Sequence, residues 1–139
     1  MGMIQSLTKN GYLGMLEKSA GHAAFRHSLL VNNISNVNTP FYKRRDTADF
    51  EKLLREAHNK TSFKAKIEKP RHIKFGRKDL EEIHPEPVII TQTRYRNDRS
   101  SVDMDVELAE ISKNGMRYQV YLKKLSGYFQ SFNGLLQGE

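Results

Sequence analysis

The chain has 139 residues, a formal net charge of +7 and a mean hydropathy of −0.68, with 37% hydrophobic and 28% charged residues. This length has room for one ordinary domain, and the absence of cysteine excludes disulfide bonds and thiolate metal sites. No run of about eighteen apolar residues occurs, so we expect no membrane-spanning helix.

Residues 1–40 are predicted to contain the N-terminal helix. Side chains recur there at alternating spacings of three and four, the seven-residue period of a helix that packs against another helix. The helix is expected to begin between Tyr12 and Leu16 and to end near Asn36 to Asn38, because Pro40 disfavours helical geometry at the residue before it. The predicted buried stripe consists of Leu13, Leu16, Ala20, Ala23, His27, Leu30, Ile34 and Val37.

Residues 41–100 form a middle segment that holds most of the positive charge. It contains sixteen basic and ten acidic residues, a net of +6. A short helix is expected over about 47–58, with an apolar face of Phe50, Leu53, Leu54 and Ala57. Helical periodicity then disappears. The alternation over 63–67 and the β-branched run 88–90 leave room for one small hairpin in an otherwise irregular segment.

Residues 101–139 are predicted to contain a second long helix, from Met104 to Leu136, roughly 50 Å long at about 1.5 Å per residue. Ser100 and Ser101 are candidate caps. Asp103, Asp105 and Glu107 lie in or near the first turn, where acidic side chains favour the helix dipole. The stripe of this helix consists of Met104, Leu108, Ile111, Gly115, Tyr118, Leu122, Leu125, Phe129, Phe132 and Leu136.

The predicted fold is mainly α, with the two long terminal helices paired as an antiparallel coiled-coil hairpin around the short middle segment. If Val37 lies near Met104, His27 falls opposite Gly115, and Ala23 falls opposite Tyr118. A lone histidine in such a stripe is more often a packed polar residue than a ligand. Further apolar residues flank both stripes, and we expect other subunits, or alternatively the middle segment, to cover them.

Residues 32–43, NNISNVNTPFYK, resemble the N-terminal signature of bacterial flagellar rod and hook axial proteins, approximately NN-(apolar)-AN-x-x-TPGYK. One departure is Phe41, where the family usually has glycine. Glycine reaches positive φ without steric cost, so we expect either an ordinary backbone conformation at Phe41 or a ring that anchors against a neighbour. Further residues resemble the proximal-rod branch of this superfamily: Arg45, Asp46, Asp49, Phe50, Arg71, His72, residues 101–107 and residues 117–119.

The resemblance implies a structural subunit of the flagellar basal-body rod, with paired terminal helices like the D0 domain of axial proteins. It implies helical self-assembly in the periplasm and torque transmission. The implied partners are the adapter FliE, the MS-ring protein FliF, the rod proteins FlgC and FlgF, and the flagellar type III export apparatus. Residues 1–6 lack the basic patch and apolar stretch of a secretory signal, and we accordingly expect export without a cleavable signal peptide.

The two stripes and the resemblance together predict the residues of subunit interfaces. They are Leu30, Asn33, Ile34, Asn36, Asn38, Thr39, Pro40, Tyr42, Asp103, Asp105, Tyr118, Leu122, Leu125, Phe129 and Phe132.

Basic residues within 43–96, with interleaved aromatic residues, leave a small nucleic-acid-binding protein as the alternative function. Acidic residues interrupt this positive field, and no groove-reading motif accompanies it. The sequence contains no nucleophile–base arrangement and no glycine-rich phosphate loop. His22 and His27 are five residues apart, which is not the spacing of a helical metal pair. We therefore expect no catalytic site, cofactor or metal.

Overall fold

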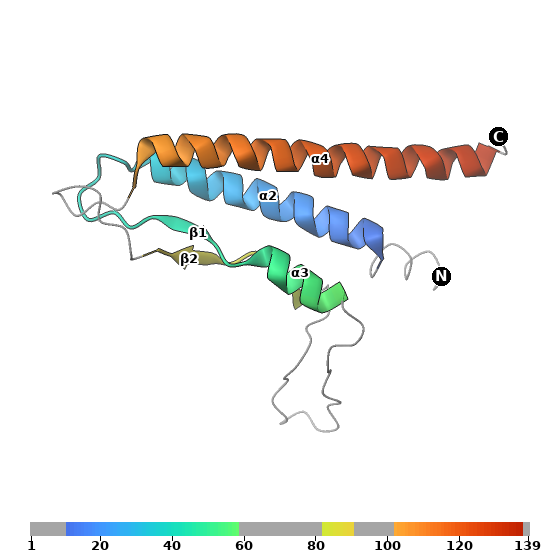
Figure 1. Ribbon diagram of the computed structural model, residues 1–139, viewed down its shortest axis with the longest axis horizontal. Coiled ribbons are helices and arrows are strands. Elements are labelled where there is room, and N and C mark those ends of the chain that lie inside the picture. Colours follow the sequence, from blue (N-terminus) through green and yellow to red (C-terminus); the bar gives the residue numbers. More distant parts are fainter. Residues whose placement is uncertain (1–10, 59–81, 91–101, 138–139) are drawn as a thin grey trace, which may run out of the picture. The chain divides into compact units, whose positions relative to one another are not determined.

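The computed structural model describes residues 11–58, 82–90 and 102–137, and all structural statements below concern these residues. In chain order the elements are α2 (Tyr12–Ser35), β1 (Arg45–Thr47), α3 (Phe50–His58), β2 (Pro87–Ile89) and α4 (Met104–Gln137) (Figure 1). The bounds of α2 and α4 confirm both predicted long helices. The described residues divide into two compact units, a smaller one of 11–15, 49–58 and 82–84 and a larger one of 16–48, 85–90 and 102–137.

In the larger unit, α2 and α4 lie antiparallel, and the C-terminal end of α2 lies beside the N-terminal end of α4 (Figure 1). Asn33 contacts Glu107, and farther along the pair the Asn114 side-chain amide donates to the Ala23 carbonyl oxygen at 2.7 Å. Residue numbers therefore fall along α2 as they rise along α4. This confirms the predicted helical hairpin, whereas supercoiling of the pair stays a prediction.

The face that α2 buries differs from the predicted stripe in its second half. His27, predicted to lie inside the stripe opposite Gly115, is exposed, and Ala23 lies against Asn114 instead of opposite Tyr118. The buried face passes instead over Leu30 and Asn33. A straight helix has 3.6 residues per turn, so a face that begins on a seven-residue repeat drifts away from it within a few turns.

β1 and β2 form a two-stranded antiparallel sheet, in which Asp46 lies opposite Val88. Val88 and Ile89, from the run 88–90 predicted to belong to a hairpin, thus pair with Asp46 and Arg45, while residues 63–67 lie outside the described residues. The predicted start of the short helix near Thr47 is wrong, because Thr47 lies in β1. The helix begins at Phe50 because Asp49 caps it, accepting a hydrogen bond from the Lys52 N–H at 3.1 Å.

The smaller unit has its own apolar core. Phe50 and Leu54 of α3 are buried together with Ile83, and Met15 and Leu53 pack against them. The predicted apolar face of the short helix is confirmed at Phe50, Leu53 and Leu54, whereas the side chain of Ala57 lies outside the described part. No helix in the described ranges combines the length and apolar character needed to cross a membrane.

α4 begins with a side-chain cap at Asp103. Its Oδ1 accepts hydrogen bonds from the backbone N–H of Asp105 at 3.0 Å and of Val106 at 3.4 Å. An acidic cap also interacts favourably with the positive end of the helix dipole. The cap is therefore Asp103, one of the acidic residues assigned to the helix start, and the other candidates, Ser100 and Ser101, lie outside the described residues.

Candidate functional site

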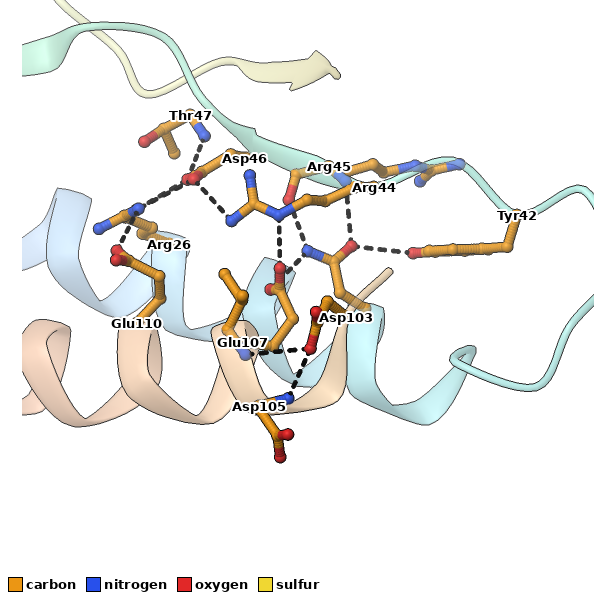
Figure 2. Close-up of polar contacts among 12 residues, drawn as sticks. Arg26, Tyr42, Arg44, Arg45, Asp46, Thr47, Asp103, Asp105, Glu107 and Glu110 are labelled. Atoms are coloured by element: carbon orange, nitrogen blue, oxygen red, sulfur yellow. Dashed lines mark hydrogen bonds and ion pairs between the residues drawn. The ribbon is translucent and has the colours of Figure 1, made fainter. Parts of the chain in front are cut away.

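Six polar side chains from α2, the β1 segment and α4 meet in the larger unit (Figure 2). We call this cluster the polar joint. It consists of Arg26, Asn33, Arg44, Asp46, Glu107 and Glu110. Arg44 immediately precedes β1, and we call residues 44–47 the β1 segment. Because side chains alternate in direction along an extended chain, Arg44 and Asp46 reach the joint while the Arg45 side chain extends away from it, as Figure 2 shows.

Arg26 connects all three segments. Its Nε and Nη2 donate to the two carboxylate oxygens of Asp46 at 2.7 and 2.9 Å, and its Nη2 also donates to Glu110 at 3.0 Å. A bidentate arginine–carboxylate pair fixes orientation as well as distance. Arg26 therefore holds β1 and α4 at defined positions along α2.

Glu107 is a fully buried carboxylate. Its Oε1 accepts a hydrogen bond from Arg44 Nε, and its Oε2 accepts one from the Asn33 side-chain amide at 3.0 Å. Charge buried in this way is tolerated only when it is paired and hydrogen-bonded. The arrangement ties the first turns of α4 to the β1 segment and to the end of α2.

Asn33 uses every hydrogen-bonding position of its side chain. Its amide nitrogen donates to Glu107 and to the Arg45 carbonyl oxygen, the latter at 2.7 Å. Its Oδ1 accepts from the Arg45 N–H at 3.0 Å and from the Tyr42 hydroxyl at 3.3 Å. An amide offers two donors and two acceptor lone pairs, a combination that neither aspartate nor alanine supplies. Asn33 therefore recognises the backbone of the β1 segment.

The joint shifts the pKa values of three of its members, Asp46, Glu110 and Arg26. Burial alone would raise the pKa of Asp46. Hydrogen bonds from Arg26 and the Thr47 N–H, together with the charges of Arg26 and Arg44, have the larger effect, so the pKa of Asp46 lies below its usual value. Hydrogen bonds from Lys113 and Arg26 likewise lower the pKa of Glu110. Both carboxylates raise the pKa of Arg26, through the hydrogen bond to Asp46 above all. Arg26, Asp46 and Glu110 are thus all charged near neutral pH.

A tight turn leads from α2 into the joint. The Tyr42 N–H donates to the Thr39 carbonyl oxygen at 3.3 Å, with Pro40 and Phe41 as the two central residues and a φ of 61° at Phe41. Proline followed by a positive φ is the pattern of a type II turn, which normally requires glycine. Of the two expectations for Phe41, the ordinary conformation is therefore wrong. Phe41 is 67% exposed.

The other predicted interface residues near this turn differ in how deeply they are buried. Leu30 and Asn33 are fully buried within the chain, and Ile34, Asn36 and Tyr42 are half-buried. Asn38, Thr39 and Pro40 are exposed. The structure brings Asn33 and Tyr42 together in a hydrogen bond, while Asn36 closes the helix end through its bond to the Asn32 carbonyl oxygen. A role in contacts between subunits stays a prediction for all of them.

α4 directs polar residues toward α2 and leaves much of its predicted apolar stripe outside. Glu107 and Asn114 are buried, whereas Ile111 and Leu125 are half-buried and Asp105 is exposed. Six members of the stripe are 36–50% exposed, and we call them the exposed stripe: Met104, Leu108, Tyr118, Leu122, Phe129 and Phe132. The face with the seven-residue apolar repeat is therefore largely available for other contacts.

The sequence did not reveal three polar residues of the α2–α4 contact, Arg26, Glu110 and Asn114, or the role of Arg44 as a partner of Glu107. One signal was present: Arg26 and Asn33 are seven residues apart, as are Glu107 and Asn114. A polar seven-residue repeat beside an apolar one indicates a second contact face. Within the described ranges, no group of three histidine, aspartate or glutamate side chains is placed to hold a metal ion.

Comparison with known proteins gives several relatives along most of the chain. It is 34% identical to the flagellar basal body rod protein FlgB of Aquifex aeolicus, over 81% of this chain and 82% of that protein. It is 28% identical to the FlgB of Bacillus subtilis, over 93% and 95% of the two chains. It is 30% identical to the FlgB of Escherichia coli, over 82% and 84%. No family model matches the chain.

Proposed function

The chain belongs to the FlgB family of flagellar basal body rod proteins, and from this premise we propose that its copies pack into the rod through the exposed stripe of α4. The coarse function follows from the family: a structural protein of the flagellar basal body. The proposal concerns how the subunit performs it.

The exposed stripe is the observation that carries the proposal. Its six side chains include Leu122, Phe129 and Phe132, each about half exposed. Fully burying such a side chain contributes about 1.5–3 kcal/mol, so completing the burial of each would contribute on the order of 1 kcal/mol. Spread along a helix of 34 residues, these contributions favour packing against a neighbouring helix.

The polar joint supports a mechanical role for the same subunit. An open helical assembly joins different patches on each copy, so each subunit must hold its patches at fixed relative positions. Arg26 and Glu107 fix α2, β1 and α4 to one another by hydrogen-bonded ion pairs. We propose that this rigidity lets the subunit carry torque without changing shape.

The proposal also includes the location of the subunit in the rod and its export route, both expected from the resemblance. We place the subunit in the periplasmic rod, between the MS-ring protein FliF with its adapter FliE and the later rod proteins FlgC and FlgF. We also propose that the subunit is exported through the flagellar type III apparatus. Electron microscopy of basal bodies from cells lacking the gene tests the placement, because rods of normal length would contradict it.

A paired substitution tests the packing proposal. Cells whose only copy carries Leu122→Ser with Phe129→Ser should retain at least tenfold less of this chain in isolated basal bodies. Met116→Ser is the matched control, because Met116 is also exposed on α4 but lies outside the stripe. Wild-type rods from the paired variant, or equal loss from the control, would contradict packing through the stripe.

Nothing in the described residues favours the nucleic-acid alternative. Arg44, within the basic region that motivated it, is paired with Glu107 and Asp46 inside the chain. Binding to phosphates would weaken steeply with added salt, whereas apolar packing of α4 would persist.

A further inference from the structure

The turn at Thr39–Tyr42 holds a phenylalanine in a backbone conformation that favours glycine. Phe41 has a φ of 61°, and it is the one described residue other than glycine with positive φ. The Cβ of an L-residue crowds the following carbonyl oxygen there, which disfavours the conformation. Phe41 is 67% exposed, so packing within the chain does little to offset that strain.

The surrounding contacts keep the turn in place. The Thr39 N–H donates to the Asn36 carbonyl oxygen at 3.0 Å, and the Tyr42 hydroxyl donates to Asn33 in the polar joint. The turn is thus held at both ends by groups that do not involve the Phe41 side chain. A glycine at this position would satisfy the same backbone without strain.

The exposed surface next to Phe41 is basic. Lys43 and Arg45 are both exposed, and Figure 2 shows the Arg45 side chain extending away from the joint. In the same chain, the first turns of α4 present the complementary surface. Met104 and Leu108 are exposed apolar residues of the stripe, and the exposed carboxylate of Asp105 lies between them in sequence.

We propose that the Phe41 ring is an anchor that docks on the first two turns of α4 in a second copy of this chain, between Met104 and Leu108. Lys43 and Arg45 of the first copy then face Asp105 of the second, so charge complementarity selects the site and the apolar pair receives the ring. The contact joins different patches of two copies, as an open helical assembly requires. It rests on the proposed assembly function and specifies which residue of a second copy contacts the first two residues of the exposed stripe.

Three substitutions at Phe41 separate an anchor from a residue that matters only for folding. Phe41→Gly removes ring and strain together, and it should lower the unfolding equilibrium constant of the purified chain about threefold relative to Phe41→Ala, which keeps the strain. Both should reduce the amount of chain in isolated basal bodies about tenfold. Phe41→Tyr should leave both quantities at wild-type values. If Phe41→Gly assembles like wild type, the anchor is excluded.

A disulfide crosslink tests whether Phe41 docks on a second copy of this chain. The chain has no cysteine of its own, so only the introduced cysteines can react. In rods from cells that express Lys43→Cys and Asp105→Cys on separate copies, oxidation should yield a disulfide-linked dimer of the two. Pairing Lys43→Cys with Ala24→Cys, an exposed position on α2, is the control and should yield at least tenfold less. Equal yields, or a crosslink only to a different protein, would overturn a second copy as the occupant.

The two proposals fail differently. If Leu122→Ser with Phe129→Ser abolishes assembly while Phe41→Gly and the crosslink have no effect, the stripe stands and the anchor falls. If the stripe variant itself builds normal rods, the proposed packing through α4 falls first.

Discussion

The polar joint buries polar side chains, whereas the exposed stripe of α4 leaves apolar side chains in contact with solvent. In the joint, charged and amide groups are buried and hydrogen-bonded to one another, with Glu107 and Asn33 fully inaccessible to solvent. Along α4 from Tyr118 to Phe132, apolar side chains remain about half exposed. An independent globular domain normally arranges these groups the other way round. The comparison teaches that the first region fixes the form of one subunit, whereas the second is suited to contacts with others.

Removing a carboxylate from the joint should have the largest effect. Glu107→Ala leaves the Arg44 guanidinium and the Asn33 amide without their buried partner, and we expect a loss of about 3–5 kcal/mol in the free energy of unfolding, measured by urea titration. Glu51→Ala is the control, because Glu51 is exposed and its pair with Arg55 spans 3.9 Å. That change should cost less than about 0.5 kcal/mol. Equal midpoints for the two variants would show that the joint does not determine stability.

Acid should weaken the joint before it affects the exposed stripe. The folded-state pKa values of Asp46 and Glu110 are lowered by Arg26 and other donors, so their contribution to stability is complete above the unfolded pKa values near 4. It is lost as the pH falls through the lower folded-state values. Urea titrations between pH 6 and pH 2 should therefore show falling stability, with a shallower fall in Asp46→Asn. An identical pH profile for that variant would contradict the assignment.

The cap of α4 should contribute less than the joint. Asp103→Ala removes the acceptor of two backbone N–H groups, and we expect a loss of about 1 kcal/mol in the free energy of unfolding. Asp105→Ala removes an exposed carboxylate from the same turn and should cost about 0.3–0.5 kcal/mol through the helix dipole alone. The order of the two variants by thermal or urea unfolding checks this assignment, and a reversed order would refute it.

Removing a residue of the exposed stripe should cost the free chain little. Phe129→Ser should lower the free energy of unfolding of the purified chain by about 1 kcal/mol at most, because half of the residue already faces solvent and only its buried half is lost. Its edge-to-face contact with Tyr128, with centroids 6.3 Å apart, is a local contribution only. A loss above about 2 kcal/mol would mean that the stripe stabilises the subunit itself, and the contrast between the two regions would disappear.

Local sequence patterns were sufficient for the long elements. The bounds of α2 and α4 agree with the repeat of three and four and with the stop before Pro40, because those signals depend on neighbouring residues only. β1 was not predicted, since Arg45–Thr47 is short, polar and paired with a strand about forty residues away. The stripe of α2 was misplaced at His27 because a seven-residue repeat was extended along a helix with 3.6 residues per turn.

The site was only partly predictable for the same reason. The signature around Asn33 marked a functional segment, but its partner Glu107 lies 74 residues away and was assigned to the helix start alone. Which buried carboxylate meets which amide depends on how α2, β1 and α4 pack, and periodicity within one helix contains no information on that. The strain at Phe41 became evident only when the turn and its φ were known.

The residues that bond α2 to α4 are far apart in the sequence, so their contacts form late during synthesis of the chain. The bonds that link α2 to α4 join residues 74, 84 and 91 positions apart. At translation rates of about 5–20 residues per second, the N-terminal third waits several seconds before its carboxylate partners leave the ribosome. Until then Arg26 and Asn33 have nothing from α4 to bind. The contacts between α2 and α4 in the joint therefore cannot form until the last third of the chain has been made.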